Sequence, residues 1–251
     1  MSGTAAVQVI PIEGLPEFEP EMRVGEEIAA RARLSDGDVV VVSQKIVSKA
    51  EGRLRRLSSV APGAEARRLG AALGKEPALV ELILEESREV LRAEAGVLIT
   101  ETRHGFVCAN SGIDSSNLPE PDTVSLLPLD PDASARRLRG EVEAAAGVRA
   151  GAIVSDSFGR AWRLGQAEVA IGCAGIRPLD DWRGRSDADG RELEATLIAI
   201  ADEAAAAADL VRDKASRVPA AIVRGLGRFV SAEDGPGAAA LRRARDQDLF
   251  R

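Results

Sequence analysis

The sequence predicts a mixed α+β fold in which strands and helices follow one another without a regular βαβ rhythm. Two short runs rich in β-branched residues, 7–12 and 38–47, have the composition of strands. Between them, GEEIAARARL has the apolar spacing of a helix, and SDGD at 35–38 is a turn signal. The chain contains neither a G-x-G-x-x-G nor a P-loop motif, so a Rossmann fold is not expected. A bound nucleotide would therefore need a binding motif of another kind.

Composition and the residues that commonly begin and end helices predict the remaining helices and strands. Residues 62–87 are rich in Ala, Leu, Glu and Arg and predict one or two helices. Residues 131–147 begin with Pro-Asp and end on a glycine, as helices commonly do. The other predicted elements are, in chain order, two extended runs within 90–110 joined by a turn near 94–96, a strand at 151–156, a long helix at 190–211, a strand at 219–227 and a helical tail at 235–250.

Composition narrows the classes of protein to which the chain can belong. Its 251 residues suit one large domain or two small ones, and its two cysteines show no paired spacing that would indicate a disulfide framework or a zinc site. The net charge of −7 disfavours nucleic-acid binding, which needs a basic face. No segment approaches the ~20 apolar residues of a membrane span. The first residues lack the basic and apolar regions of a signal peptide, so we expect a cytoplasmic protein.

Two polar segments follow the first two predicted strands. PIEGLPEFEP at 11–20 is a turn whose backbone donors can meet a ligand, although it can equally be an ordinary connection. In SQKIVSKAEGR at 43–53, Lys45 and Lys49 share one face if the strand continues, because side chains in a strand alternate with a period of two. Ammonium groups and hydroxyls on one face suit phosphate oxygens. The alternative is a solvated strand end.

Two further segments place carboxylates where a hard cation can bind. Asp114 lies in the small polar turn ANSGIDSSN, although Asp and Asn in such turns also bond their own backbone. In AIVSDSFGRAWRLGQ at 152–166, a predicted strand is expected to end at Asp156 and Ser157. A carboxylate beside a hydroxyl is a common way to hold Mg²⁺ or Mn²⁺.

Arginines follow these two residues. Arg160 and Arg163 can neutralise phosphate charge, although Arg163 can instead pair with Glu168, and Trp162 is expected to pack. The four polar segments together suggest phosphoryl chemistry, which depends mainly on positioning and on charges supplied by metal ions, Lys and Arg. The residues themselves do not identify the phosphate or its acceptor.

The same segments resemble a known family. IPIEGLPEF, DVVVVSQKIVSKAEGR, LITETRHGFVCANSGIDSSN, VSDSFGRAWRLGQ, DGREL and ADLVRDKAS followed by VPAAIVRG occur in this order between about residues 7 and 250. They are similar to coenzyme F420-0:L-glutamate ligases. The resemblance implies a family-specific α+β fold, not ATP-grasp, made of one two-lobed domain over 1–251 that forms an intertwined homodimer. It further implies a GTP-dependent amide ligase that joins γ-linked L-glutamate to a deazaflavin coenzyme through an acyl phosphate.

The resemblance also assigns roles to individual residues. It implies two divalent ions, Mg²⁺ or Mn²⁺, bound by Asp114, Asp156 and Ser157, and leaves open whether K⁺ assists. Asp114, Asp156 and Arg160 are the implied catalytic residues. The implied nucleotide contacts are Leu15, Pro16, Glu17, Phe18, Gln44, Lys49, Asn117, Lys214 and Ser216.

Some positions depart from the family pattern. After Gln166, relatives often have Thr-Asp or Thr-Asn, where this chain has Ala167 and Glu168, and Ala161 replaces a frequent proline. If the altered pair touches substrate, the chain is a γ-glutamyl ligase for another carboxylate acceptor. A third interpretation is a catalytically silent module that binds GTP or GDP with metal. The nitroreductase-like domain that follows the ligase module in many relatives is not part of this sequence, so a short glutamate tail is expected.

Overall fold

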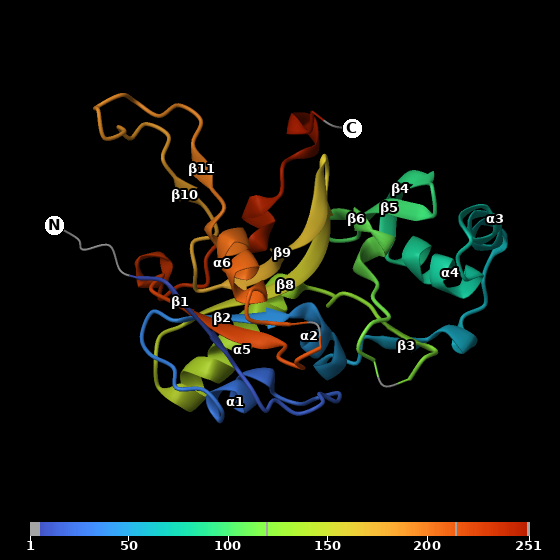
Figure 1. Cartoon of the computed structure of the whole chain (residues 1–251), viewed down its shortest axis with the longest axis horizontal. Coiled ribbons are helices and arrows are strands. Elements are labelled where there is room, and N and C mark those ends of the chain that lie inside the picture. Colours follow the sequence, from blue (N-terminus) through green and yellow to red (C-terminus); the bar gives the residue numbers. More distant parts are fainter. Residues whose placement is uncertain (1–5, 119, 214, 250–251) are drawn as a thin grey trace.

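The computed structural model describes residues 6–118, 120–213 and 215–249, and its mixed α and β content confirms the predicted α+β class. Two lobes lie side by side in Figure 1. The larger lobe contains a five-stranded sheet with the order β1-β12-β2-β8-β9, in which β2 and β8 are parallel and the other pairs antiparallel. The strands are β1 Gln8–Pro11, β2 Val39–Ser43, β8 Gly151–Arg160, β9 Arg163–Ala174 and β12 Ala220–Arg224.

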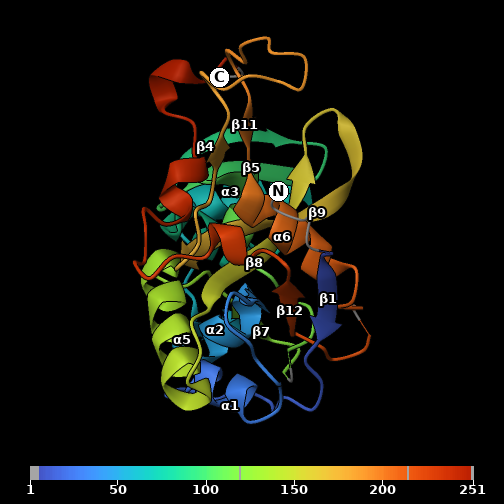
Figure 2. The same ribbon diagram turned by 90° about the vertical axis from the view of Figure 1, so that its left-hand side faces the viewer.

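Helices cover both faces of this sheet (Figure 2). One face packs against α1 Val24–Ala29, α2 Gln44–Ala50 and α5 Pro131–Ala146, and the other packs against α6 Ile200–Asp209. The valines of β2 alternate between the two cores, since Val40 and Val42 join the first and Val39 and Val41 the second. This central position explains why the strand is a continuous apolar run and not an alternating one.

The smaller lobe is built from the chain between α2 and α5. Its elements are β3 Leu54–Arg56, η1 Leu57–Ser59, α3 Ala64–Leu73, α4 Pro77–Glu85, β4 Ser87–Glu94, β5 Val97–Thr102, β6 Val107–Ala109, η2 Asn110–Gly112 and β7 Thr123–Ser125. Strands β4, β5 and β6 form a separate sheet, and β3 pairs with β7. A third core holds the lobe together, with Leu82, Ile83 and Leu98 at most 1% exposed. The predicted helices at 62–87 and the predicted turn near 94–96 are confirmed.

The strand predicted over 38–47 is too long. It ends at Ser43, whose hydroxyl accepts a hydrogen bond from the Lys45 backbone N–H and caps α2. Lys45 and Lys49 therefore share a face because they are four residues apart on a helix, not because they alternate on a strand.

Three other boundaries differ from prediction. Strand β8 does not end at Asp156 but continues to Arg160, where it turns into β9. Residues 190–199 are not helical and belong to an arm that carries the short pair β10 Asp180–Asp181 and β11 Leu197–Ile198. The helical tail predicted over 235–250 is wrong for the described residues up to 249, since after β12 they contain only the 3₁₀ turns η3 Gly227–Phe229, η4 Ala238–Leu241 and η5 Arg245–Gln247. No described helix is long and apolar enough to cross a membrane.

Candidate functional site

One cavity gathers most of the residues predicted to bind a nucleotide. It has a volume of about 690 Å³ and lies beside α2, at the end of β2. Its walls come from the turn at 15–18, from α2, from 116–118 and from the segment that follows α6. The lining residues are Leu15, Pro16, Glu17, Phe18, Ser43, Lys45, Ile46, Lys49, Ser116, Asn117, Leu118, Glu168, Asp209, Arg212, Asp213, Arg217, Val218 and Pro219.

The turn at 15–18 is held in place by local contacts. Gly14 has a φ of 71°, which favours glycine, and its carbonyl accepts a hydrogen bond of 2.6 Å from Arg31 Nε. The Phe18 side chain is buried in the main core and anchors the end of the turn. Glu17 pairs with Lys49 Nζ, which joins this turn to α2.

Two predicted nucleotide contacts are placed differently. Gln44 is buried and does not line the cavity, since its Oε1 accepts a hydrogen bond of 2.7 Å from Ser48 Oγ. Ser216 is exposed, and its hydroxyl donates to the backbone carbonyl of Asp213. Lys214 lies outside the described residues. Lys45, in contrast, lines the cavity, in agreement with its expected affinity for phosphate oxygens, although the resemblance did not include it among the nucleotide contacts. The basic pair on α2 is the sequence signal that indicates it.

Lys45 also joins the two lobes. Its Nζ lies 2.9 Å from Asp114 Oδ2 and donates a hydrogen bond of 2.7 Å to the Ser116 carbonyl. Asp114 belongs to the smaller lobe, where its backbone pairs with Ser125. Burial opposes ionisation of Asp114, but hydrogen bonds from Lys45 and Ser116 outweigh it and lower the pKa of this carboxyl. Asp114 is therefore ionised at neutral pH.

Asp156 is the second carboxylate near Lys45. It lies on β8 opposite Val169, and burial, together with the negative charges of Glu168 and Asp114, raises its pKa to about 7. A cation placed between Asp114 and Asp156 would offset this repulsion. Two carboxylates suit one Mg²⁺ or Mn²⁺ ion whose other ligands are water and phosphate. The two residues fit the predicted cation, although the described residues contain no ready group of three acidic, His or Cys ligands.

Ser157 does not complete this pair. Successive side chains of a strand point to opposite faces, so Ser157 projects away from the face that carries Asp156. Its hydroxyl donates a hydrogen bond of 2.5 Å to Oε1 of Glu168, its neighbour across the hairpin. The structure thus brings Asp114 and Asp156 together and places Ser157 in a different cluster.

The predicted arginines lie at the exposed tip of the β8–β9 hairpin. Arg160 donates hydrogen bonds to the carbonyls of Leu164 and Gly165 and does not line the cavity. Trp162 is 80% exposed in the single chain and joins none of its three cores. The alternative pairing of Arg163 with Glu168 is wrong, because Glu168 binds Arg212 instead. The sequence offered no signal for Arg212 beyond a charge at the end of an apolar run.

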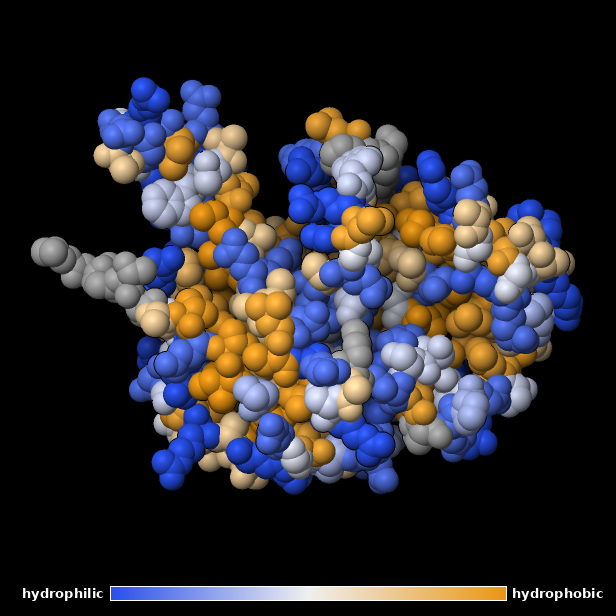
Figure 3. Space-filling model, viewed as in Figure 1, coloured by the Kyte–Doolittle hydropathy of each residue, from blue (hydrophilic) through white to orange (hydrophobic). Residues whose placement is uncertain are grey.

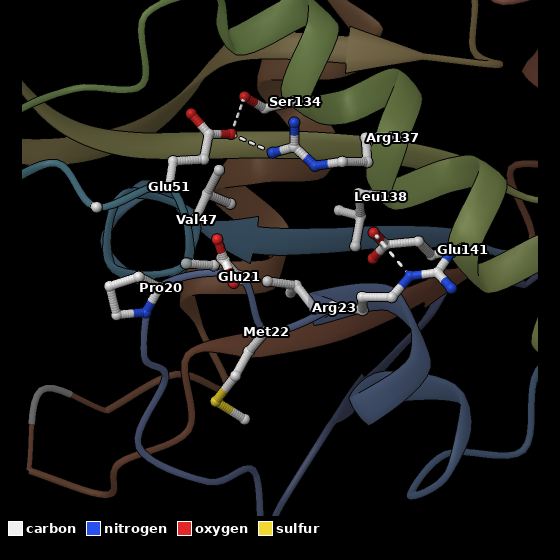
Figure 4. Close-up of a pocket in the computed structure, with 13 residues that line it drawn as sticks. Pro20, Glu21, Met22, Arg23, Val47, Glu51, Ser134, Arg137, Leu138 and Glu141 are labelled. Carbon is white, nitrogen blue, oxygen red and sulfur yellow. Dashed lines mark hydrogen bonds and ion pairs between the residues drawn. The ribbon is translucent and has the colours of Figure 1, made fainter.

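Figure 4 shows a second cavity, of about 700 Å³, on the other side of α2. Glu51 accepts hydrogen bonds there from Ser134 and Arg137, and Glu141 binds the backbone N–H of residue 25 and lies 3.6 Å from Arg23. None of the predicted site residues lines it. These two carboxylates tie α2 and α1 to α5, so we assign the cavity a structural role.

The affinity for a divalent cation is expected to depend on pH. A proton competes with the cation for Asp156 below its pKa of about 7, whereas Asp114 stays ionised because its pKa is lowered. The Kd for Mn²⁺ should rise by about tenfold per pH unit below 7 and level off above it. Titration of Mn²⁺ followed by electron paramagnetic resonance between pH 5.5 and 8.5 measures this. A Kd that stays constant below pH 7 would contradict the assignment.

Comparison with known proteins identifies the family to which the chain belongs. Residues 14–225 match the family described as F420-0:Gamma-glutamyl ligase. The chain is 44% identical over 221 residues to the coenzyme F420:L-glutamate ligase of Archaeoglobus fulgidus, which covers 88% of each chain. It is 40% identical over 247 residues to the protein of that name from Methanocaldococcus jannaschii, covering 98% of this chain and 97% of the relative. The chain therefore belongs to the F420-0:gamma-glutamyl ligase family.

Proposed function

We propose that the protein is a ligase that adds γ-linked L-glutamate to the deazaflavin coenzyme F420-0 and uses GTP to activate the acceptor. Membership of the family supports the ligase and its substrates. The observation that carries the proposal is the position of the cavity. Two lysines of α2 and the turn at 15–18 line it, and Lys45 bonds Asp114 directly beside it.

The chemistry needs an activated carboxyl group. The acceptor carboxylate takes the γ-phosphoryl group of GTP, which releases GDP and forms an acyl phosphate. The nitrogen of L-glutamate then attacks the carbonyl carbon, phosphate leaves with the bonding electron pair, and the amine loses a proton. Phosphate is a far better leaving group than the oxide ion that an unactivated carboxylate would have to expel.

The residues of the chain have separable tasks in this scheme. Lys45 and Lys49 present ammonium groups that bind phosphate oxygens. Asp114 and Asp156 would hold a divalent cation, which supplies positive charge to the phosphates when it is bound. Phe18 and the cap at Ser43 keep the turn and α2 in fixed positions, so the phosphates meet donors that are already oriented.

Mass spectrometry of the acceptor tests the proposal. Purified protein is mixed with F420-0, L-glutamate and Mn²⁺, and separate reactions receive GTP, ATP or no nucleotide. Glutamyl additions that require GTP are expected, and their number gives the tail length. An unmodified acceptor, in a protein that still binds GDP and Mn²⁺, would contradict the proposal and favour another acceptor or a silent module. Addition with ATP alone would contradict the nucleotide assignment only.

A Lys49→Met variant is expected to bind GDP about 10- to 100-fold more weakly, because a charge-assisted hydrogen bond contributes about 1.5–3 kcal/mol. Calorimetric titration with GDP and Mn²⁺ measures the change. Lys75→Met, a matched change at a lysine that does not line the cavity, should leave the Kd unaltered. An unchanged Kd in Lys49→Met would exclude this lysine as a nucleotide contact.

We also propose that the protein is a homodimer. Large apolar side chains are exposed, with Trp162 at 80% and Leu164 at 98% on the hairpin tip and Leu210 at 85% after α6. Figure 3 shows apolar side chains gathered on the α6 side of the larger lobe. Analytical ultracentrifugation should give twice the mass of the chain, and Leu164→Asp should shift the species towards the monomer. A monomer at all concentrations would contradict this proposal.

A further inference from the structure

The side of β8 that carries Ser157 holds a buried cluster of oxygen atoms. Glu168 is 6% exposed, and its Oε1 and Oε2 accept hydrogen bonds of 2.5 Å from Ser157 Oγ and Ser155 Oγ. Ser155 and Ser157 lie two residues apart on β8, so their side chains share a face, and Glu168 faces them from β9. A carboxylate between two hydroxyls is a donor set that suits a hard cation.

Arg212 already supplies the positive charge that a bound cation would bring to this cluster. Arg212 is 7% exposed, and its Nη2 donates a hydrogen bond of 2.9 Å to Glu168 Oε2 and lies 3.1 Å from Ser155 Oγ. This contact is an ion pair between two buried side chains, with Arg212 5% and Glu168 6% exposed at the side chain. Its Nε and Nη1 are buried without a hydrogen-bond partner among the described residues.

The side of β8 that carries Asp156 holds another set of charges. Asp156 feels the charges of Asp114 and Lys45, and Lys45 is itself bonded to Asp114 and Ser116. No arginine in the described part of the chain pairs with the carboxyl group of Asp156. Lys45 can move to phosphate oxygens when a nucleotide binds, because its side chain is a flexible chain that ends in a point charge. Asp156 therefore offers a carboxylate whose charge no described arginine balances, whereas the Glu168 cluster, which lines the cavity together with Arg212, already contains a cation.

We propose that Arg212 is a built-in counter-cation for Glu168, to which Ser157 is hydrogen-bonded, and that the site consequently holds one divalent cation, at Asp114 and Asp156, and not two. This rests on the proposed function, because that function places a cation at the two aspartates. Ser157 and Glu168 then position the hairpin and do not bind metal. Ser157, which was expected to bind a second ion, does not fit one, since its hydroxyl is bonded to a carboxylate whose charge Arg212 already balances.

The test counts bound ions. Mn²⁺ is titrated into the protein with saturating GDP, and free Mn²⁺ is measured by electron paramagnetic resonance. The wild-type chain is compared with a Glu168→Gln/Arg212→Met double variant, which removes both charges of the pair and leaves the net charge unchanged. Asp38→Asn/Arg224→Met removes another aspartate–arginine pair, at the opposite end of β2, and is the control for general destabilisation.

One Mn²⁺ per chain is expected in all three proteins, with Kd values within about threefold of one another. Two ions per chain in the wild type would overturn the inference, whether or not the double variant keeps both. A loss of affinity of tenfold or more in the double variant, but not in the control, would show that Glu168 binds the cation and would also overturn it. Wild-type protein that binds no Mn²⁺ would refute the cation site of the proposed function together with this inference.

Discussion

An Asp156→Asn variant is expected to lose about a thousandfold in the rate of glutamate addition while it stays folded. Asparagine keeps the size and one oxygen of the side chain but removes the negative charge that pairs with the divalent cation. Removal of one preorganised electrostatic group in an active site commonly lowers kcat by about 10²–10³, and loss of the cation adds to this. Initial rates measured by mass spectrometry at saturating GTP and Mn²⁺ give the comparison.

Folding should not be the cause of this loss. Ionised Asp156 is destabilised by burial and by its acidic neighbours, which is why its pKa rises to about 7. A neutral amide at this position should therefore leave the melting temperature equal to or above that of the wild type at pH 8 without metal.

Asp202→Asn provides a matched control. Asp202 is a partly buried aspartate of α6 whose pKa burial raises, and its carboxylate accepts a hydrogen bond from the Ala170 backbone N–H. Asparagine can accept the same bond, so near-normal activity is expected. If Asp156→Asn keeps more than a tenth of wild-type activity, the cation does not depend on Asp156 and the proposed site is wrong.

An Arg212→Met variant is expected to lose about 3–5 kcal/mol of unfolding free energy. The substitution leaves the buried Glu168 carboxylate without its ionic partner, and breaking one side of a buried pair carries a cost of this size. For a chain of this length, such a loss lowers the melting temperature by roughly 10 °C. Thermal and urea unfolding followed by circular dichroism measure both quantities.

Two further variants distinguish the loss of the buried ion pair from other causes of lower stability. Adding Glu168→Gln to Arg212→Met removes the unpaired charge and should recover most of the loss. Arg245→Met breaks an exposed pair with Glu89, where the arginine side chain is 68% exposed, and should leave the free energy of unfolding almost unchanged. A loss in Arg212→Met as small as that in Arg245→Met would mean that the buried pair adds little to folding.

Local patterns were sufficient for the elements whose signals lie within a few residues. The valines of β2 predicted a strand, and Pro131 and Gly147 marked the ends of α5, where Gly147 has a φ of 69°. The same patterns failed at the end of β2, because the apolar spacing of 44–47 suits a strand as well as a helix. The cap at Ser43 and the packing of Ile46 and Val47 in the core decided in favour of the helix.

The candidate site was likewise predictable in part from local patterns and in part only from the tertiary structure. Lys45, Lys49, Asp114 and Asp156 were found from short motifs, because each stands in a polar segment after an apolar run. Their convergence was suggested by the resemblance to a family and not by spacing. That Asp156 and Ser157 face opposite sides became visible only once β8 was seen to continue past them.

The sequence by itself determined the class of fold, the central strands and the segments that carry chemistry, because these depend on periodicity and on the chemistry of neighbouring residues. Only the tertiary structure decided which polar groups meet. Glu168 and Arg212 are 44 residues apart and join because the segment after α6 packs on the face of the sheet to which the Glu168 side chain points. The partner of a buried charge is set by such long-range packing, and no local pattern in the chain encodes it.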